Sequence, residues 1–471
     1  MSMDELRTLH IKEGLAFLDQ QRILQPSVND QVGFDFQGLR YSFRDDPRHP
    51  DAKFVARFGR IWIYDVALGI YADLKAGRLR QAGYQVGRAM QLAFQEEAKG
   101  FRGGWHFSYN TREDSFIDPR GPAGANAWCI NAVYSYILAA QDTSPLAWLN
   151  RLVQKYLFSQ QVLDPADPRY GLFRAGLHNA QELALGPDQM GYKVYEGEPN
   201  RQYEHVILEH NADIAGTLRL AFRATKRFAP RETEFLAQLI RRHDLLMQGI
   251  KRGFWVGDHF VSAMDGKGKF YLGTDGAPSI AIDNNTWAAH VFIPYEPAMA
   301  LSSLEFVRDR FSIRVPPAHI EDVPAGAAPG PLEGVFYFTA AFQDPFVEVP
   351  PQHRTKLERL FQLEAAYGLV LFMRDAAESA PDQAQAQRIR QEAAELYSHT
   401  VTLQRLYGPS AAPYASANVP AVFSTLNSVT TAATGIVVSA IMGGASGDDF
   451  IGVIPPLEFA VAGKPPAISV P

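Results

Sequence analysis

One short run of the sequence concentrates side chains that could do chemistry. The segment Glu209-His-Asn-Ala-Asp213 places two carboxylates, an imidazole and an amide within five residues, and Ile214 and Leu218 follow at helical spacing. Covering this group without polar partners would cost desolvation free energy, so the run indicates a solvent-accessible site at the start of a helix. The alternative is a capping cluster in which Asn211 or Asp213 accepts hydrogen bonds from free backbone N–H groups.

The same combination recurs at other expected helix starts. Each has an acidic or amide residue close to an aromatic residue, followed by an apolar helix. These segments are Trp62-Ile-Tyr-Asp65, Asn126-Ala-Trp128, Asp283-Asn-Asn-Thr-Trp287 and Phe361-Gln-Leu-Glu364-Ala-Ala-Tyr367. The helix dipole accounts for a carboxylate at a helix N-terminus, but it does not account for the aromatic neighbour. Because aromatic faces can cover the apolar faces of pyranose rings while carboxylates and amides bind the hydroxyls, the pattern indicates a carbohydrate site.

Two sets of candidate residues follow from this interpretation. The candidate catalytic carboxyls are Asp65, Glu209, Asp283 and Glu364. The candidate substrate-binding residues are Trp62, Tyr64, Trp105, Asn126, Trp128, His210, Asn211, Asn285, Trp287 and Tyr367. Hydrolysis of a glycosidic bond usually needs two carboxyl groups, one of which is protonated.

The surroundings of each carboxyl suggest its role. We expect Glu209 to be one of the two catalytic carboxyls, with His210 holding the substrate or tuning the protonation of Glu209. Glu364 is followed by Ala-Ala-Tyr and is expected to be the most desolvated of the four. Burial raises a carboxyl pKa and suits a general acid, which leaves Asp65 and Asp283 as the base or as ligands of hydroxyls. The alternative for Glu364 is a structural acid bonded to nearby backbone.

These residues need a scaffold that gathers them, and the apolar pattern predicts antiparallel pairs of helices. Helices are expected at about 3–23, 67–77, 79–98, 121–138, 145–159, 206–225, 231–249, 283–310 in two halves, 353–376, 382–407 and within 424–442. Extended segments are expected at 33–46, 103–112, 116–119, 253–260, 269–272 and 334–339, with 160–205 mostly loop and 315–331 a linker. Helices paired in this way can close into a ring with the inner-helix starts gathered at one rim.

Composition narrows the class of protein. The 471-residue chain is 46% hydrophobic and 20% charged, as in ordinary globular proteins, and its net charge of −6 gives no basic surface for nucleic acid. No apolar run is long enough for a membrane span. The start, Met-Ser-Met-Asp-Glu-Leu-Arg, is not typical of a signal peptide, which fits a cytoplasmic protein or an exported one whose leader has been replaced. We expect one domain over 1–454 and a Pro-rich tail over 455–471.

Other chemistries have weaker support. The single cysteine, Cys129, lies in an apolar helical run and excludes an internal disulfide or a cysteine-based zinc cluster. The pairs Glu204-His205 and Glu209-His210 are five residues apart, unlike the four-residue spacing of helical zinc motifs. A phosphate-binding loop, a serine nucleophile elbow and a dinucleotide fingerprint are absent from the sequence. We therefore expect neither a cofactor nor a metal.

Taken in order, these motifs resemble the six-hairpin glycosidase superfamily, and more closely a group of bacterial (α/α)6-toroid proteins regarded as candidate glycoside hydrolases. The motifs are Tyr64-Asp65, Ala125-Asn-Ala-Trp128, Glu209-His-Asn-Ala-Asp213, Asp283-Asn-Asn-Thr-Trp287, Leu363-Glu364-Ala365 and Ser428-Val-Thr-Thr-Ala-Ala-Thr-Gly435. The resemblance implies an all-α (α/α)6 toroid with short β-strands in the loops at one rim. It also implies a glycoside hydrolase, and by analogy an inverting one. Leu363-Glu364-Ala365 departs from the Glu-Gly-Thr-like turn expected there.

Three alternatives remain compatible with the residues. A sugar epimerase on the same toroid would need two facing histidines, for which His210 with His290 or His399 is available. A polysaccharide lyase would use tyrosine with histidine or arginine in a similar groove. In a non-catalytic carbohydrate-binding scaffold, the acids would serve only as caps and hydroxyl ligands.

Overall fold

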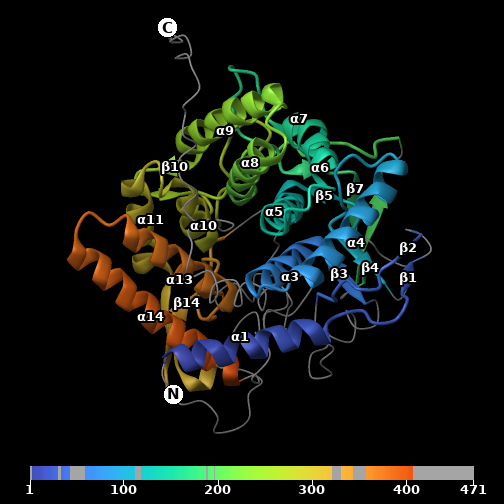
Figure 1. Cartoon of the computed structure of the whole chain (residues 1–471). Coiled ribbons are helices and arrows are strands. Elements are labelled where there is room, and N and C mark those ends of the chain that lie inside the picture. The colour runs from blue at the N-terminus through green and yellow to red at the C-terminus, as the bar shows by residue number, and fades with distance from the viewer. Residues whose placement is uncertain are drawn as a thin grey trace.

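Five helices stand side by side around the centre of the molecule, and each is followed by a partner on the outside (Figure 1). The inner helices are α3 (Ile63–Lys75), α5 (Ala123–Ala140), α8 (Leu208–Phe228), α10 (Ile282–Phe292) and α13 (Leu363–Glu378). The outer partners are α4 (Leu79–Ala98), α6 (Leu146–Leu152) continuing through the π-helical turn η1 (Val153–Leu157) into α7 (Phe158–Gln160), α9 (Thr233–Phe254), α11 (Pro297–Phe311) and α14 (Gln383–Leu406). These five described hairpins are arranged as expected for an (α/α)6 toroid.

The structure, a computed structural model, describes residues 3–29, 33–42, 59–111, 118–186, 189–195, 197–320, 330–342 and 357–406. Within these ranges a further helix, α1 (Met3–Gln20), runs along the outside of the ring near α3 and α14 (Figure 1). Arg405 of α14 lies 3.7 Å from Glu13 of α1. The helix expected within 424–442 and the tail expected over 455–471 lie outside the described residues.

Inner and outer helices differ in how they are buried. Helix α5 is buried on every side from Ala123 through Tyr134, because α3 and α8 flank it and its own partner covers it. The sequence pattern predicted a single apolar stripe, which suits an outer helix such as α9 better. Small residues at the start of α5 let its neighbours approach closely; a Cβ on Gly124 would lie 2.3 Å from the His210 ring.

Short antiparallel strands link the hairpins at one end of the ring. The segment before each inner helix pairs with the segment before the next inner helix. The pairs are β3 (Arg60–Trp62) with β4 (Ser108–Asn110), β5 (Gly121–Pro122) with β6 (Gly176–Leu177), β9 (Val206–Ile207) with β12 (Ala263–Met264), and the bridge of Ala281 with Phe338. This repeated link sets the inner-helix starts at a common level.

The remaining strands form two-stranded ribbons in the described part of the chain. They are β1 (Val28–Asn29) with β2 (Phe34–Asp35), β7 (Ala180–Gly186) with β8 (Gln189–Val194), β10 (Trp255–Val256) with β11 (His259–Phe260), and β13 (Ser312–Val315) with β14 (Leu332–Val335); a 3-10 turn, η2, covers Pro317–His319.

The segment 160–205, expected to be mostly loop, also contains β6 and the β7–β8 hairpin, which were not predicted. One expected helix was wrong in its extent. The helix expected over 353–376 is interrupted: Gln362 is extended and its N–H donates to the Val335 carbonyl, and α13 begins after it at Leu363. Pairing with β14, far away in the sequence, overrode the local helical pattern at Gln362.

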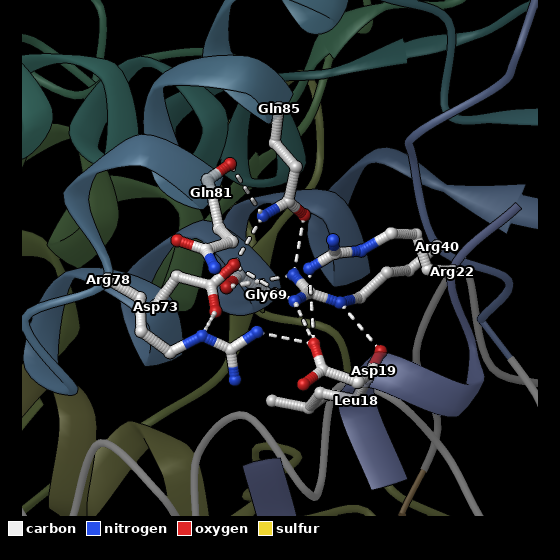
Figure 2. Close-up of polar contacts among 9 residues, drawn as sticks. All are labelled: Leu18, Asp19, Arg22, Arg40, Gly69, Asp73, Arg78, Gln81 and Gln85. Carbon is white, nitrogen blue, oxygen red and sulfur yellow. Dashed lines mark hydrogen bonds and ion pairs between the residues drawn. The ribbon is translucent and has the colours of Figure 1, made fainter. Parts of the chain in front are cut away.

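A buried ion-pair cluster ties the N-terminal segment to the ring (Figure 2). Arg40, only 1% exposed, donates to Asp73 of α3 at 2.9 Å, to Gln85 of α4 at 2.6 Å and to the Leu18 carbonyl of α1 at 2.8 Å. We call Arg40, Asp73, Arg78, Gln85 and Asp19 the Arg40 cluster. Because its charges are paired, the desolvation of Arg40 is compensated by hydrogen bonds.

Candidate active site

The five inner helices begin with the same backbone geometry. In each, the residue before the helix is extended, with φ between −61° and −121° and ψ between 118° and 158°. The first helical residue is apolar and fully buried; these residues are Ile63, Ala123, Leu208, Ile282 and Leu363. The next residue along is rotated by about 100° around the helix axis, so it faces a different direction from the buried one.

The second residues of the inner helices are therefore equivalent, and we call them the rim: Tyr64, Gly124, Glu209, Asp283 and Glu364. The four rim residues with side chains are all partly exposed. Three of the four candidate catalytic carboxyls thus occupy equivalent positions at one end of the ring. The fourth, Asp65, is the third residue of α3 and is only 1% exposed, so we leave it out of the candidate site.

Asp283 and Glu364, from the neighbouring helices α10 and α13, interact directly through their charges. Burial raises the pKa of Asp283 from 3.8 to about 7; a hydrogen bond from Tyr337 opposes this rise, and the negative charge of Glu364 adds to it. The Tyr337 hydroxyl donates to Asp283 Oδ2, and the Tyr64 hydroxyl donates to Glu364 Oε1 at 2.7 Å. A carboxyl that titrates near neutral pH can supply a proton, which is what a general acid must do.

Beneath the rim, the centre of the ring is filled by two stacked indoles and a carboxyl. Trp128 and Trp287 stack with ring centroids 5.5 Å apart, and the edge of Tyr64 meets Trp128 at 5.1 Å. Trp287 Nε1 donates to Asp213 Oδ1 at 3.3 Å. Burial raises the pKa of Asp213 well above its usual value; hydrogen bonds from both indoles lower it, and Asp283 raises it further.

The two tryptophans were predicted to stack on sugar rings, but their faces are turned to each other. Trp128 is 2% and Trp287 8% exposed, so they form a floor under the rim rather than an open platform. Trp62 stacks on Phe107, with ring centroids 5.9 Å apart. Because Trp62 is still partly exposed, it offers an aromatic surface near the rim.

The three predicted asparagine ligands have a structural role instead. Each is the fourth residue of an inner helix, is at most 3% exposed, and clamps both the N–H and the C=O of one residue in the preceding loop. Asn126 clamps Trp105 at 3.0 and 3.0 Å, Asn211 clamps Phe173 at 2.7 and 3.0 Å, and Asn285 clamps Phe260 at 2.8 and 2.9 Å. We call them the asparagine clamps. Since their amides are satisfied by backbone inside the protein, they are not placed to bind substrate.

Two further predicted ligands are also buried. Trp105 is fully buried and its Nε1 donates to the Ala89 carbonyl at 2.7 Å. Tyr367 is fully buried and its hydroxyl donates to Gln404 of α14 at 2.9 Å. Both side chains face the layer between inner and outer helices, so neither belongs to the candidate site.

His210 lies against the rim from α8, directly over Gly124 of α5. Burial, with a smaller contribution from His205, lowers its pKa to about 3, so the imidazole is neutral at physiological pH. The histidines expected as its epimerase partners lie elsewhere. His290 is seven residues past Asp283, 2% exposed and bonded to Asp375 at 2.6 Å, and His399 lies on the outer helix α14.

Sequence reasoning missed the roles of Tyr337 and Asp213. Tyr337 lies in the segment 334–339, expected only as extended, and it reaches Asp283 because the Ile282 N–H donates to the Tyr337 carbonyl at 3.0 Å. Nothing local signals this pairing across 54 residues. Asp213 did carry a signal, since it is four residues after Glu209 and so lies on the same helix face.

The described part of the chain has neither a metal-binding cluster nor a membrane-spanning helix. No group of three or more His, Cys, Asp or Glu side chains there is arranged to hold a metal ion. None of the described helices combines the length and apolar character that crossing a bilayer requires. Cys129, predicted to be a buried thiol, is fully buried, and burial raises its pKa.

Comparisons with known proteins place the fold. No protein-family model and no curated protein sequence matches this chain. Among solved structures, a D-mannose isomerase superposes with a TM-score of 0.58 at 10% identity, covering 94% of this chain and 97% of that one. A cellobiose 2-epimerase from Spirochaeta thermophila gives 0.56 at 12% identity, with 94% and 97% coverage. A glycosidase variant in complex with glucose gives 0.51 at 13% identity, with 97% and 100% coverage. With its paired helices curled around a common centre, the protein therefore has the six-hairpin glycosidase fold, the (α/α)6 toroid.

Proposed function

We propose that the protein is a carbohydrate-active enzyme, and specifically a glycoside hydrolase whose carboxyl pair is Asp283 and Glu364. The observation that carries the proposal is the pairing of these acids at the rim, where Asp283 titrates near neutral pH beside a second carboxyl. The fold supports the carbohydrate class, because its structural neighbours include glycosidases, sugar isomerases and epimerases.

In the proposed reaction, Asp283 donates its proton to the glycosidic oxygen as the bond from that oxygen to the anomeric carbon breaks. The bonding electrons leave with the oxygen. Glu364 accepts a proton from a water molecule whose oxygen forms the new bond to the anomeric carbon. We retain inversion as the proposed stereochemistry; it requires the water to attack from the face opposite the leaving group. Glu209, at the equivalent position on α8, is proposed to bind a sugar hydroxyl.

This differs in two respects from the roles expected from the sequence. Glu209 was expected to be one of the two catalytic carboxyls and is now proposed as a ligand of a hydroxyl, and the acid has changed. Glu364 was expected to be the acid, because it precedes an apolar helix. In the structure Asp283 has the raised pKa, with burial as its main cause. We therefore propose Asp283 as the acid and Glu364 as the base.

The test is a panel of 4-nitrophenyl glycosides and neutral oligosaccharides assayed for release of nitrophenol or new reducing ends. Asp283→Asn and Glu364→Gln should each lower kcat by about 10²–10⁴-fold, whereas Glu209→Gln should mainly raise KM. Proton NMR of the first-formed anomer reports the stereochemistry. Turnover that persists within fivefold in both variants would reject this carboxyl pair. Sugar binding without turnover would identify a non-catalytic carbohydrate-binding protein.

A second candidate function is aldose–ketose isomerisation, and His210 at the rim favours it. A neutral imidazole can take the proton from C2 of an open-chain sugar and return it to C1, and only one base is needed. The structural similarity to a D-mannose isomerase agrees with this chemistry. Incubating mannose, glucose and cellobiose with the enzyme in D2O distinguishes the two functions. Deuterium at C1 or C2 that disappears in His210→Ala supports the isomerase, and its absence in the wild type rejects it.

A further inference from the structure

Each carboxyl of the proposed pair receives a tyrosine hydroxyl from a different part of the chain. Tyr337 follows β14 and donates to Asp283 Oδ2, and Tyr64 is on α3 and donates to Glu364 Oε1 at 2.7 Å. Neither tyrosine is on the helix that carries its carboxyl. Each hydroxyl therefore reaches its acid from a segment other than the helix that carries the acid.

Both tyrosines are held in place by contacts that do not involve the acids. The Tyr337 carbonyl accepts from the Ile282 N–H at 3.0 Å, and the adjacent Phe338 bridges Ala281, so the backbone of Tyr337 is fixed to the start of α10. The ring of Tyr64 meets Trp128 edge-on, with centroids 5.1 Å apart and planes at 89°. Fixed donors of this kind can impose an orientation on a carboxyl.

We infer that Tyr337 and Tyr64 are positioning residues: Tyr337 fixes the proton of neutral Asp283 on Oδ1, and Tyr64 holds Glu364 in its ionised, proton-accepting form. The inference rests on the proposed glycoside hydrolase and deepens it. Because the Tyr337 hydroxyl donates to Oδ2, that oxygen is already an acceptor, and the acid proton of Asp283 is left to Oδ1. Because a hydrogen bond to a carboxylate stabilises the ionised form, the donor at Glu364 favours its role as base.

The charged and titratable groups around the pair determine the direction of the expected effects. Asp283 faces Tyr337, Glu364 of α13 and Asp213 of α8, and Glu364 faces Tyr64 and Asp283. Tyr337→Phe removes a bond that lowers the pKa of Asp283, so Asp283 should stay protonated to higher pH. Tyr64→Phe removes a bond to the carboxylate of Glu364, so Glu364 should accept protons at higher pH than before.

The first experiment needs no substrate. Carbon-13 NMR of the full-length protein labelled at the Asp and Glu carboxyl carbons, with signals assigned through Asp283→Asn and Glu364→Gln, follows both titrations. Tyr337→Phe should move the Asp283 midpoint upward by about one pH unit, the size expected for losing one hydrogen bond to an ionised group, and Tyr64→Phe should move the Glu364 titration upward by a similar amount. Unchanged or lower midpoints would overturn the inference.

The matched control is Tyr134→Phe, which removes the hydroxyl of a buried inner-helix tyrosine bonded to Asn150 at 2.8 Å. It should leave both titrations unchanged, and a shift equal to those of the rim variants would contradict the inference.

The pH dependence of turnover gives the second readout. If Asp283 is the acid, Tyr337→Phe moves the alkaline limb of the kcat/KM profile to higher pH and widens the active range. If Glu364 is the base, Tyr64→Phe moves the acidic limb to higher pH and narrows the range. Shifts of the opposite limbs would overturn the division of roles. Failure of the proposed function is a different outcome: in that case Asp283→Asn and Glu364→Gln remain active.

Discussion

The two ends of α3 belong to two contrasting clusters of polar side chains. Near its C-terminal end Asp73 is fully buried, and its two carboxyl oxygens meet Arg40 at 2.9 Å and Arg78 at 3.1 Å (Figure 2). At its N-terminal end Tyr64 bonds Glu364, which in turn raises the pKa of Asp283. In the described part of the chain Asp283 has a tyrosine hydroxyl and a like charge for neighbours, and no cation is found beside it.

The contrast separates stabilising polar groups from groups held ready for chemistry. The Arg40 cluster pairs opposite charges and joins α1, α3 and α4, so removing one partner would leave a buried charge uncompensated. Asp283 is partly buried beside a second acid, an arrangement that disfavours its ionised form and costs stability above neutral pH. Carboxyls perturbed in this way cluster at functional sites, where the cost is offset by the rest of the fold. Four predictions, from the largest effect to the smallest, test this contrast.

The Arg40 cluster should give the largest effect on stability. Asp73→Ala leaves the buried guanidinium of Arg40 without its closest carboxylate, and we expect the free energy of unfolding to fall by about 3–5 kcal/mol. Urea denaturation followed by circular dichroism measures the loss. Asp19→Ala is the matched control, because the Asp19 side chain is 47% exposed and should cost at most about 1 kcal/mol. Equal losses in the two variants would remove the distinction between buried and exposed pairs.

His210 and Asn211, adjacent in the Glu209–Asp213 segment, should differ almost as clearly in their effect on stability. Asn211→Ala breaks the clamp on Phe173 and leaves a buried N–H unpaired, so we expect a loss of about 2–3 kcal/mol. His210→Ala, one residue earlier and at the rim, should cost less than about 1 kcal/mol. Thermal unfolding of the two variants side by side is the measurement. A more severe loss for His210→Ala would mean that the rim, not the clamp, carries stability.

The third prediction concerns the pH dependence of stability. Because the pKa of Asp283 is raised to about 7 in the folded state, the folded protein holds a proton that the unfolded chain releases near pH 4. Stability should therefore be greatest below about pH 4 for this group and fall by about 1–2 kcal/mol as the pH rises to 7, a loss reduced by solvent screening. Asp283→Asn should abolish this decrease. Urea midpoints measured from pH 4 to pH 9 test it, and parallel curves would contradict the raised pKa.

The smallest effect is expected where a rim position lacks a side chain. Gly124→Ala places a Cβ against the imidazole of His210, which can move because it is the far end of a side chain. We expect a stability change of less than about 1 kcal/mol together with a shifted His210 ring signal in two-dimensional NMR. An unperturbed His210 signal would show that the ring does not lie over Gly124 in solution.

Much of the fold was within reach of the sequence, because helical periodicity is local. The helix expected at 79–98 is observed as Leu79–Ala98, and the one expected at 382–407 is one residue shorter at each end. The expected pair of helices over 283–310 is observed as α10 and α11, which end at Phe311. The starts near Tyr64, Glu209 and Asp283 were also recognised, since an extended segment followed by a polar residue and an apolar run is visible in a single stretch. The start of α13 at Leu363 was not recognised, because the extended Gln362 before it bonds Val335, far away in the sequence. The β7–β8 hairpin was also missed, although its two strands are neighbours in the sequence.

Only some of the residues predicted for the site lie at the rim. Residue type alone could not separate Asn211 from Glu209, or Asp65 from Tyr64, because neighbours in a helix point in directions about 100° apart. The second position of each inner helix reaches the rim, the third of α3 is buried, and the fourth of α5, α8 and α10 holds a loop.

The helices, their pairing and the residue types at the five inner-helix starts follow from the amino-acid sequence, because each of these is encoded within one contiguous stretch. Which of those residues act together depends on how the chain folds. The pairing of Ala281 with Phe338 brings Tyr337 to Asp283, and the curvature of the ring brings Tyr64 to Glu364 across 300 residues of chain. The physical reason is that a carboxyl's proton affinity depends on burial and on the charges nearby, and both are set by the arrangement of distant segments in space.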